Sequence, residues 1–263
     1  MAEKYNRIAV LTSGGDAPGM NAAIRGVVRT AYAHGITVLG VKRGYNGLIR
    51  NDMQELGVLD VNGLTGLGGT VLYTARSEEF KTEDGLQRAI KSCEYMGIEA
   101  VIVIGGDGSF RGALELANHG IPTIGIPGTI DNDIACTNYT IGFDTAANTA
   151  IEAIDKLRDT MQSHERCSVV EVMGHNAGHL AVYVGIATGA IAVLVPEREL
   201  DFDADVLQKI QNGKIHGRTN NIVIVAEGAG NTLEIAERIE ATTKMEARVT
   251  ILGHVQRGGR PNA

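Results

Sequence analysis

Tryptophan is absent from this 263-residue sequence, and aromatic residues make up only 4% of it. A protein with so few aromatic side chains offers no platform on which nucleic-acid bases could stack. Cysteine is also scarce: Cys93, Cys136 and Cys167 are odd in number and widely spaced. This pattern argues against a disulfide framework and against a zinc site, so we expect packed or surface thiols.

Long apolar runs and basic runs are missing as well. No apolar run is long enough to cross a bilayer, and the N-terminal MAEKYNR leads into an apolar segment without the hydrophobic core of a signal peptide. We therefore expect a cytoplasmic protein with no membrane partner. The formal net charge is −7 without a block of Lys and Arg, which argues against nucleic acid as the main partner, although local basic clusters can still bind small phosphates.

Glycine is abundant, with 34 residues in a chain that is 44% hydrophobic and long enough for one large or two small domains. The most informative glycines follow the apolar run 101–104, in VIVIGGDGSF. The run predicts a strand buried on both faces, Gly105 and Gly106 predict a tight turn, and a helix is expected to begin near Ser109. The N–H groups and the dipole of that helix would face the turn and favour an anion.

Asp107 lies among these donors, where an acidic side chain would repel a bare phosphate. We therefore interpret Asp107 as a ligand of a magnesium ion that the phosphate carries. The alternative is a strand-to-helix turn that requires glycine only for its backbone conformation, since short glycine motifs recur by accident.

A second glycine-rich turn occurs near the N-terminus. Residues 8–12 form an apolar run, SGGDAPGMN follows, and a helical pattern extends from about Asn21 to Gly35. In a parallel sheet such turns gather at the carboxyl ends of the strands, where ligands bind. Arg25 and Arg29 share one face of this helix, either as solvated surface or as part of an anion site.

The rest of the chain continues the alternation of strand and helix that is typical of a parallel sheet. A turn at 44–47 places Tyr45 near the same edge, and a loop or short strand at 56–74 leads to Arg76. Further strands are expected at 36–41, 122–126, 168–173, 191–195, 222–226 and 248–252, and further helices at 82–96, 145–162, 177–186, 204–215 and 232–241. No low-complexity linker separates the two halves, so we expect one compact body with a hinge near Phe143.

Two aspartates, Asp131 and Asp133, follow the strand at 122–126. A carboxylate here could accept a proton from a substrate hydroxyl while that oxygen attacks a phosphoryl group. The alternative is an Asx-turn loop, because Asp, Asn and Thr all favour turns. Near the C-terminus, GHVQRGGRPNA brings His254 and Arg257 to another strand end, where the combination indicates an anion contact.

Five motifs extend this pattern to a known family. In this order and spacing, SGGDAPGMNAAIRG, IGGDGS, PGTIDND, VVEVMG and GHVQRGG resemble the bacterial-type ATP-dependent 6-phosphofructokinases, from about Ile8 to the C-terminus. GGDG alone also occurs in NAD kinases and diacylglycerol kinases, but PGTIDND excludes them. The resemblance implies two Rossmann-like three-layer α/β/α units with mainly parallel sheets. It also implies transfer of the γ-phosphoryl group of ATP to the 1-hydroxyl of fructose 6-phosphate, with magnesium.

Residue roles are carried over from the resemblance position by position. Asp131 is implied to be the general base, with Thr129 and Asp133 beside it, and Asp107 is implied to be the magnesium ligand. The ATP site is implied to comprise Gly15, Tyr45, Arg76, Ser77, Gly106, Asp107, Gly108 and Ser109. The acceptor site is implied to comprise Thr129, Ile130, Asp131, Arg166, Met173, Gly174, His175, Glu227, Arg248, His254 and Arg257.

The resemblance also bears on assembly, donor and domain division. The family's counterparts of Arg166 and Arg248 act from a neighbouring subunit, so a homotetramer is expected.

Pyrophosphate-using relatives place Asp and Lys where this sequence has Gly108 and Gly128. Those two side chains fill the nucleoside pocket, so the two glycines favour ATP. An ATP- and magnesium-binding domain is expected at 1–142 and 254–263, and a sugar-phosphate-binding domain at 143–253.

Two departures from the family pattern concern the sites. His175, a catalytic position, and His179 stand where the family has arginine and aspartate; exchanging an always-charged group for an imidazole is expected to slow turnover. The family's effector residues are only partly matched, since Val58 and Ile191 replace a basic residue and a glutamate. We therefore expect weak or absent activation by ADP and inhibition by phosphoenolpyruvate. The matching effector positions are Arg25, Arg29, Arg158 and Arg218.

The third departure is that the sequence stops just after QRGG, where the family continues. The first domain is therefore expected to lack elements and to expose apolar surface. Two other hypotheses stay open. One is a pyrophosphate-dependent enzyme, and the other is a truncated, weakly catalytic subunit that binds nucleotide or sugar phosphate.

Overall fold

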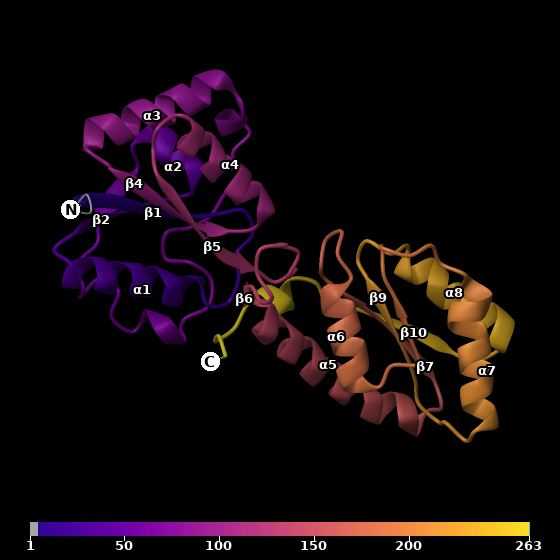
Figure 1. The fold of residues 1–263 in the computed structure, drawn as a ribbon. Helices are drawn as coiled ribbons and strands as arrows, with labels where there is room; N and C mark the ends of the chain where they lie inside the picture. Colours follow the sequence, from indigo (N-terminus) through magenta and orange to yellow (C-terminus); the bar gives the residue numbers. More distant parts are fainter. Residues whose placement is uncertain (1–4, 263) are drawn as a thin grey trace. The chain divides into compact units, whose positions relative to one another are not determined.

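The computed structural model describes residues 5–262, which divide into two compact units (Figure 1). The first unit comprises the described residues up to Thr129, Ile134–Gly142 and the described residues from Arg257 onward. The second comprises Ile130–Asp133 and Phe143–Gln256. These bounds differ from the expected division at 130–133 and 254–256, which belong to the second unit.

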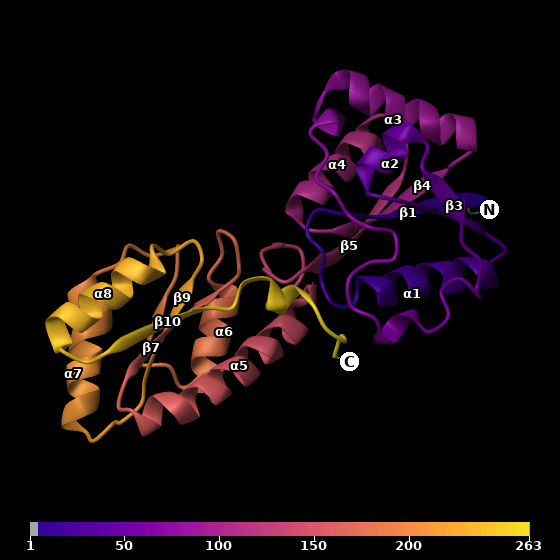
Figure 2. The same cartoon turned by 180° about the vertical axis from the view of Figure 1, so that it is seen from behind.

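The first unit contains a six-stranded sheet in the order β3-β2-β1-β4-β5-β6. All neighbours run parallel except β2 and β3, which pair antiparallel. Helix α1 covers one face and helices α2, α3 and α4 cover the other (Figures 1 and 2). The strands are β1 (Arg7–Ser13), β2 (Thr37–Val41), β3 (Met53–Glu55), β4 (Ala100–Gly105), β5 (Thr123–Thr129) and β6 (Ile141–Gly142), and the helices are α1 (Met20–Ala33), α2 (Tyr45–Arg50), α3 (Glu83–Met96) and α4 (Asp107–Asn118).

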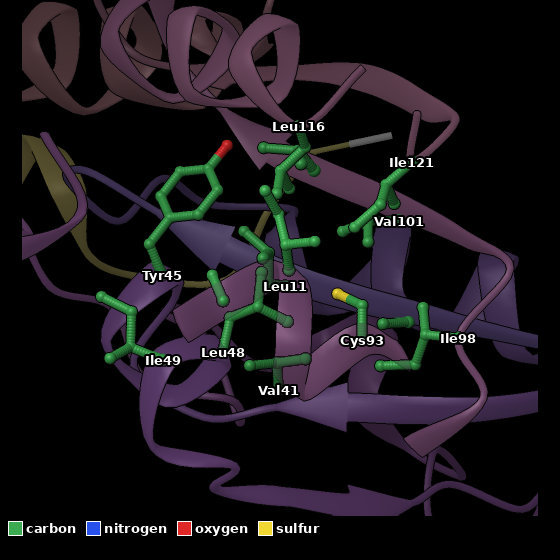
Figure 3. Packing of buried hydrophobic residues seen from close by; sticks show 14 of the residues in the cluster. Leu11, Val41, Tyr45, Leu48, Ile49, Cys93, Ile98, Val101, Leu116 and Ile121 are labelled. Atoms are coloured by element: carbon green, nitrogen blue, oxygen red, sulfur yellow. The ribbon is translucent and has the colours of Figure 1, made fainter. Parts of the chain in front are cut away.

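The core of the first unit lies between the sheet and the three helices on one face. Figure 3 shows Leu11 and Val101, from neighbouring strands, with Leu48 of α2 and Leu116 of α4; all four are buried in one cluster. Burying one such aliphatic side chain contributes about 1.5–3 kcal/mol. Cys93 packs in the same cluster, and burial raises the pKa of its thiol to about 12, so it is one of the expected packed thiols.

The ends of helix α3 illustrate how local sequence fixes the boundaries. The Thr82 hydroxyl oxygen accepts a hydrogen bond from the Gly85 backbone N–H at 3.1 Å, which caps the first turn. Gly97 ends the helix in the left-handed region, with φ of 63°. The expected helix at 82–96 is confirmed.

The second unit contains a four-stranded, wholly parallel sheet in the order β10-β7-β9-β8. Helices α5 and α6 cover one face, while α7 and α8 cover the other, where they enclose a second core (Figures 1 and 2). The strands are β7 (Cys167–Val172), β8 (Ala192–Leu194), β9 (Asn221–Ala226) and β10 (Ala247–Ile251), and the helices are α5 (Phe143–Ser163), α6 (His179–Thr188), α7 (Gln208–Ile215) and α8 (Thr232–Thr243).

Three sequence predictions about local structure are wrong in detail. The turn expected at 44–47 is the start of helix α2, whose buried residues Tyr45, Leu48 and Ile49 recur at helical spacing. The helix after the central strand begins at Asp107 rather than near Ser109. The helix expected at 204–215 opens with a π-helical turn at Asp203–Leu207. Among the described residues, no helix is long and apolar enough to span a membrane.

Candidate active site

The two glycine-rich turns meet at the carboxyl edge of the first unit's sheet. Ser13 of β1 and Gly105 of β4 are register partners, and both strands end at these residues. The Ser109 hydroxyl, in the first turn of α4, donates to the Ser13 carbonyl oxygen at 2.9 Å. This buried hydrogen bond joins the start of α4 to the end of β1, so the two predicted turns form one surface.

The glycines of this edge differ in the space around them. A Cβ atom at Gly105 would lie 2.5 Å from the Ser13 carbonyl oxygen and 2.6 Å from the Ser109 hydroxyl oxygen, so only glycine fits. A Cβ atom at Gly108 would meet nothing within 4 Å. At Gly128 it would lie 3.1 Å from the Ile104 side chain, so a side chain there points toward packed atoms. Of the two glycines expected to leave room for a nucleoside, Gly108 faces open space and Gly128 does not.

Asp107 is the first residue of helix α4, where the helix dipole favours a negative charge. Its side chain is 57% exposed and pairs with Arg111 one turn later at 2.8 Å. An exposed carboxylate beside an anion-binding helix N-terminus fits a magnesium ion, because Mg²⁺ typically takes one or two protein carboxylates and completes its shell with phosphates and water. The donor chemistry of this position therefore agrees with the interpretation of Asp107 as a metal ligand.

Tyr45 supports this edge from within the core. Its hydroxyl donates to the Ser109 carbonyl oxygen at 2.6 Å, and its ring stacks on Phe80 with centroids 4.1 Å apart. The side chain is only 4% exposed, and burial raises the pKa of its phenol. The sequence placed Tyr45 at the right edge, but it did not indicate that the ring would be buried under α4; a direct nucleotide contact of Tyr45 stays a prediction.

The segment that carries Arg76 and Ser77 crosses the end of β1. The Thr74 hydroxyl donates to the Gly14 carbonyl oxygen at 2.8 Å, and the Arg76 carbonyl oxygen accepts from the Asn46 side-chain amide at 3.3 Å. The Arg76 side chain is exposed, whereas the Ser77 hydroxyl oxygen accepts from the Phe80 backbone N–H at 3.2 Å, in the short 3-10 turn Glu79–Lys81. Arg76 is therefore available to a ligand at this edge.

Arg257 lies against the first glycine turn, a placement that sequence reasoning missed. One of its terminal nitrogens, Nη1, donates to the Asp16 carbonyl oxygen at 3.2 Å. A Cβ atom at Gly15 would collide with the guanidinium group. Gly15 thus allows a cation that is distant in sequence to contact the turn after β1, and this cation adds a positive charge to the edge predicted to bind an anion.

The aspartate segment begins where β5 ends. Thr129 is the last residue of β5, its carbonyl oxygen accepts from the Thr140 hydroxyl at 2.7 Å, and a Cβ atom at Gly106 would lie 3.7 Å from the Thr129 Cβ. Thr129 is therefore beside the β4–α4 turn. Asp131 is half-buried and Asp133 is exposed. Ile130 between Thr129 and Asp131 is fully buried, which anchors the segment.

A different group of predicted residues lies at the carboxyl edge of the second unit. Met173, Gly174 and His175 follow β7, and Glu227 follows β9, the neighbouring strand. One oxygen of the Glu227 carboxylate, Oε1, accepts from the backbone N–H of His175 at 2.6 Å and from that of Gly174 at 3.3 Å. The loop is held with φ of 143° at Gly174 and 53° at His175, and the His175 side chain is exposed.

The C-terminal motif supports the same edge. Gln256 is fully buried; its carbonyl oxygen Oε1 accepts from the Met173 backbone N–H at 3.3 Å, and its amide nitrogen donates to the Gly253 carbonyl oxygen at 3.0 Å. His254 is exposed on the short 3-10 turn Gly253–Arg257. Sequence analysis singled out His254 and Arg257 but missed Gln256, although it lies between them in the motif.

Arg166 and Arg248 lie at the opposite edge of the second unit's sheet. Arg166 precedes β7 and Arg248 is the second residue of β10, so both are near the amino ends of parallel strands. The six residues of β7 lie between Arg166 and Met173, which places the two about 20 Å apart at the rise of a strand. One small sugar phosphate cannot contact both edges of the same sheet. If all these residues bind one ligand, a second copy of the chain must supply the two arginines.

Two of the expected effector arginines already have partners. Arg158 and Arg218 donate from their terminal nitrogens to the carbonyl oxygens of Thr188 and Gly189, at the C-terminal end of α6. These contacts neutralise the negative end of the α6 dipole. In the first unit, Arg25 is half-buried and Arg29 is exposed on α1.

The fold and these edges define a class: an α/β protein of two three-layer units, with a glycine-rich strand–helix junction flanked by arginines, the kind of junction that suits an anion. Comparison with known proteins gives the particular family, because the sequence profile described as Phosphofructokinase matches residues 7–263. The chain therefore belongs to the phosphofructokinase family. The predicted resemblance and the predicted α/β fold class are both confirmed.

Curated relatives match almost the whole chain. An ATP-dependent 6-phosphofructokinase of Clostridium tetani is 58% identical over 258 residues, which is 98% of this chain and 80% of that protein. The enzyme of the same name from Brevibacillus brevis is 54% identical over 257 residues, again 98% of this chain and 80% of that protein.

Solved structures agree with this assignment. The phosphofructokinase of Saccharomyces cerevisiae is 38% identical with a TM-score of 0.90, covering 97% of this chain and 39% of that chain. A T-state Pichia pastoris phosphofructokinase is 38% identical with a TM-score of 0.92, and the match covers 99% of this chain and 31% of that chain. A pyrophosphate-dependent phosphofructokinase from Marinobacter aquaeolei has a TM-score of 0.83 at 20% identity, and the match covers 96% of this chain and 69% of that chain. This likeness concerns the fold alone.

Proposed function

We propose that this chain is an ATP-dependent 6-phosphofructokinase that transfers the γ-phosphoryl group of ATP to the 1-hydroxyl of fructose 6-phosphate, yielding fructose 1,6-bisphosphate and ADP. The observation that carries the proposal is the 54–58% identity, over 98% of the chain, to curated enzymes with that name. The enzyme is then a glycolytic phosphotransferase. Because the relatives are glycolytic enzymes, we propose a cytoplasmic location.

The donor site is the carboxyl edge of the first unit. The N-terminal N–H groups of α4 hold the phosphates, and Arg76 adds positive charge. Gly108 leaves room beside them, which favours ATP over pyrophosphate. Asp107 would hold Mg²⁺, which when bound offsets the charge of the ATP phosphates. The other donor-site residues, Gly15, Tyr45, Ser77, Gly106 and Ser109, form or support the two turns.

Asp131 acts as the general base. Its carboxylate takes the proton of the 1-hydroxyl while that oxygen bonds to the γ-phosphorus and the bond to the bridging oxygen of ADP breaks. Thr129 and Asp133 flank Asp131 and orient the reacting groups. Positioning and charge neutralisation supply most of the remaining acceleration in a phosphoryl transfer.

The acceptor binds at the carboxyl edge of the second unit and is completed by another copy of the chain. Met173, Gly174 and Glu227 contact the sugar, His175 contacts the transferred group, and His254 and Arg257 contact phosphate. Arg166 and Arg248 of a second copy bind the 6-phosphate, because in one copy they lie about 20 Å from Met173 along the sheet. The active form is therefore a homo-oligomer, and we propose a homotetramer.

The effector response is proposed to be weak. Arg158 and Arg218 already donate hydrogen bonds to carbonyl oxygens at the C-terminus of α6. The side chain of Ile191 has no oxygen that could bind a metal ion. The fructose 6-phosphate saturation curve should therefore shift little when ADP or phosphoenolpyruvate is added. A strong shift with either ligand would contradict this part of the proposal.

The test is a donor swap on the purified oligomer. Fructose 1,6-bisphosphate formation is measured with fructose 6-phosphate, magnesium and either ATP or pyrophosphate, with a sizing column run in parallel. Activity with ATP alone supports the proposal, and activity with pyrophosphate alone supports the rival donor. A folded oligomer that forms no fructose 1,6-bisphosphate with either donor would indicate that the chain is a binding subunit instead.

A further inference from the structure

Glu246 lies between the two arginines at the amino edge of the second unit's sheet. Its Oε2 accepts from Arg166 Nε at 2.5 Å, and its Oε1 pairs with Arg248 Nη2. The arrangement follows from strand register: Ala247 of β10 pairs with Cys167 of β7, and the Cys167 N–H donates to the Glu246 carbonyl oxygen at 2.9 Å. Neighbouring parallel strands thus place Glu246 beside Arg166, while Arg248 is two residues further along β10.

The charges of this trio depend on one another. Two guanidinium groups carry two positive charges that repel when brought together, whereas the carboxylate between them leaves a net charge of about +1. Desolvation raises the pKa of the Glu246 carboxyl, but the hydrogen bonds and charges of Arg166 and Arg248 together outweigh it, so the pKa is lowered. The side chains of Arg166, Glu246 and Arg248 are 27%, 37% and 58% exposed, so the trio is open to a ligand on one side.

Most of the hydrogen-bonding capacity of the two arginines is unused. A guanidinium group has five N–H donors. Within the described chain, the Arg166 side chain makes one contact, through Nε, and the Arg248 side chain makes one, through Nη2; both go to Glu246. The contact through Nε leaves both terminal nitrogens of Arg166 for a planar, two-point contact with a phosphate.

We propose that Glu246 is a positioning residue that holds Arg166 and Arg248 together in the geometry that binds the 6-phosphate of the acceptor in a neighbouring copy. This inference rests on the proposed function, because it assumes that both arginines bind the acceptor. Glu246 itself does not touch the acceptor. Its loss therefore weakens acceptor binding and leaves nucleotide binding and the chemical step intact.

If Glu246 instead blocked the two arginines, its removal would change acceptor affinity in the opposite direction. A carboxylate that merely occupied the arginines would compete with the phosphate, and its removal would tighten acceptor binding. Glu246→Gln keeps the shape and one acceptor oxygen of the side chain but removes the charge, so it distinguishes the two roles. Glu240→Gln is the matched control, since Glu240 accepts from the Ala247 N–H at 3.4 Å at the same edge and pairs with no arginine in the described chain.

The experiment measures KM for fructose 6-phosphate, KM for ATP and kcat in the full-chain oligomer, with the oligomer checked by sizing. For Glu246→Gln we expect an increase of at least about tenfold in the acceptor KM, with kcat and the ATP KM changed less than about twofold. Glu240→Gln is expected to match the unmodified chain. In an Arg166→Ala background, Glu246→Gln is expected to add little, because the arginine that it positions is gone.

The outcomes separate the inference from the function on which it rests. An unchanged or lower acceptor KM in Glu246→Gln, with the unmodified chain active, overturns the role of Glu246 and leaves the kinase function standing. No turnover by the folded, oligomeric unmodified chain overturns both. If Glu246→Gln does not assemble, Glu246→Asp, which keeps the charge, is measured instead: an intermediate rise in the acceptor KM supports the inference, and no rise overturns it.

Discussion

The hydroxyl of Ser109 donates a hydrogen bond to the backbone carbonyl oxygen of Ser13, 96 residues earlier in the chain and 2.9 Å away. This contact joins the first turn of α4 to the end of β1, and the Tyr45 hydroxyl braces the same turn through the Ser109 carbonyl oxygen. The geometry of the loop that is proposed to bind phosphate is therefore set by buried polar contacts under the loop rather than by the loop sequence alone.

Ser109→Ala is expected to lower both stability and nucleotide affinity. Loss of the hydroxyl leaves the buried Ser13 carbonyl oxygen without this partner, which costs about 1–3 kcal/mol in the free energy of unfolding. Urea denaturation measures that loss, and steady-state kinetics measures the accompanying rise in the KM for ATP. Ser163→Ala removes an exposed hydroxyl contact on α5 and should leave both quantities within error. Equal effects of the two substitutions would refute the role of Ser109.

Gly108→Asp is expected to raise the KM for ATP at least about tenfold without unfolding the protein. A side chain at this position enters open space at the start of α4, where it adds no clash but places a second carboxylate beside Asp107 and the phosphates. Gly26→Asp on α1 is the matched control, because Gly26 is exposed and its Cβ would also meet nothing within 4 Å. An unchanged ATP KM in Gly108→Asp would place the nucleotide elsewhere.

His175→Arg is expected to increase kcat, because a guanidinium brings a permanent positive charge and five N–H donors to the transferred phosphoryl group. Steady-state kinetics of the two chains measures the change in kcat. The backbone N–H of His175 is bound to Glu227, a contact that arginine also makes, so the loop is preserved. An unchanged or lower kcat in His175→Arg would exclude a charge role at position 175.

Thiol reactivity is expected to distinguish the three cysteines. Cys93 and Cys167 are buried, and burial raises the pKa of each thiol to about 12, while Cys136 is exposed. At pH 8 a disulfide reagent such as DTNB should titrate one thiol in the native chain and three in denaturant. The raised pKa values also mean that the neutral thiols favour the folded state below about pH 9, and that this contribution is lost as the pH rises toward 12. Rapid titration of three native thiols would contradict the packing of both cores.

Much of the fold could be predicted because each element carries its own local signal. The apolar run ending at Gly105, the Thr82 cap and the left-handed Gly97 mark their strand or helix boundaries in the sequence. Helix α2 has the sequence of a turn because its six residues include glycine, and what stabilises the helix is the burial of Tyr45 and Leu48 against the sheet. Such tertiary burial has no short-range signature.

Among the site residues, too, some carry a local sequence signal and others depend on tertiary contacts. The predicted site residues, such as Asp107 and Asp131, lie in motifs at strand ends, where chemistry and position coincide in the sequence. The contacts that the sequence does not indicate act across long sequence separations: Arg257 contacts the turn at Asp16, and Glu246 contacts Arg166, 80 residues earlier. Their partners are set by strand register, which the periodicity of one strand does not reveal.

The most direct test of this account compares the unmodified chain with Asp131→Asn in the ATP- and fructose 6-phosphate-dependent formation of fructose 1,6-bisphosphate. We predict turnover by the unmodified oligomer, and a kcat lower by about 10²–10⁴-fold in Asp131→Asn with the KM for ATP nearly unchanged, since removal of a general base costs on that order. A variant that retains the full rate would contradict the assignment of Asp131, and an unmodified oligomer that forms no fructose 1,6-bisphosphate would contradict the kinase function itself.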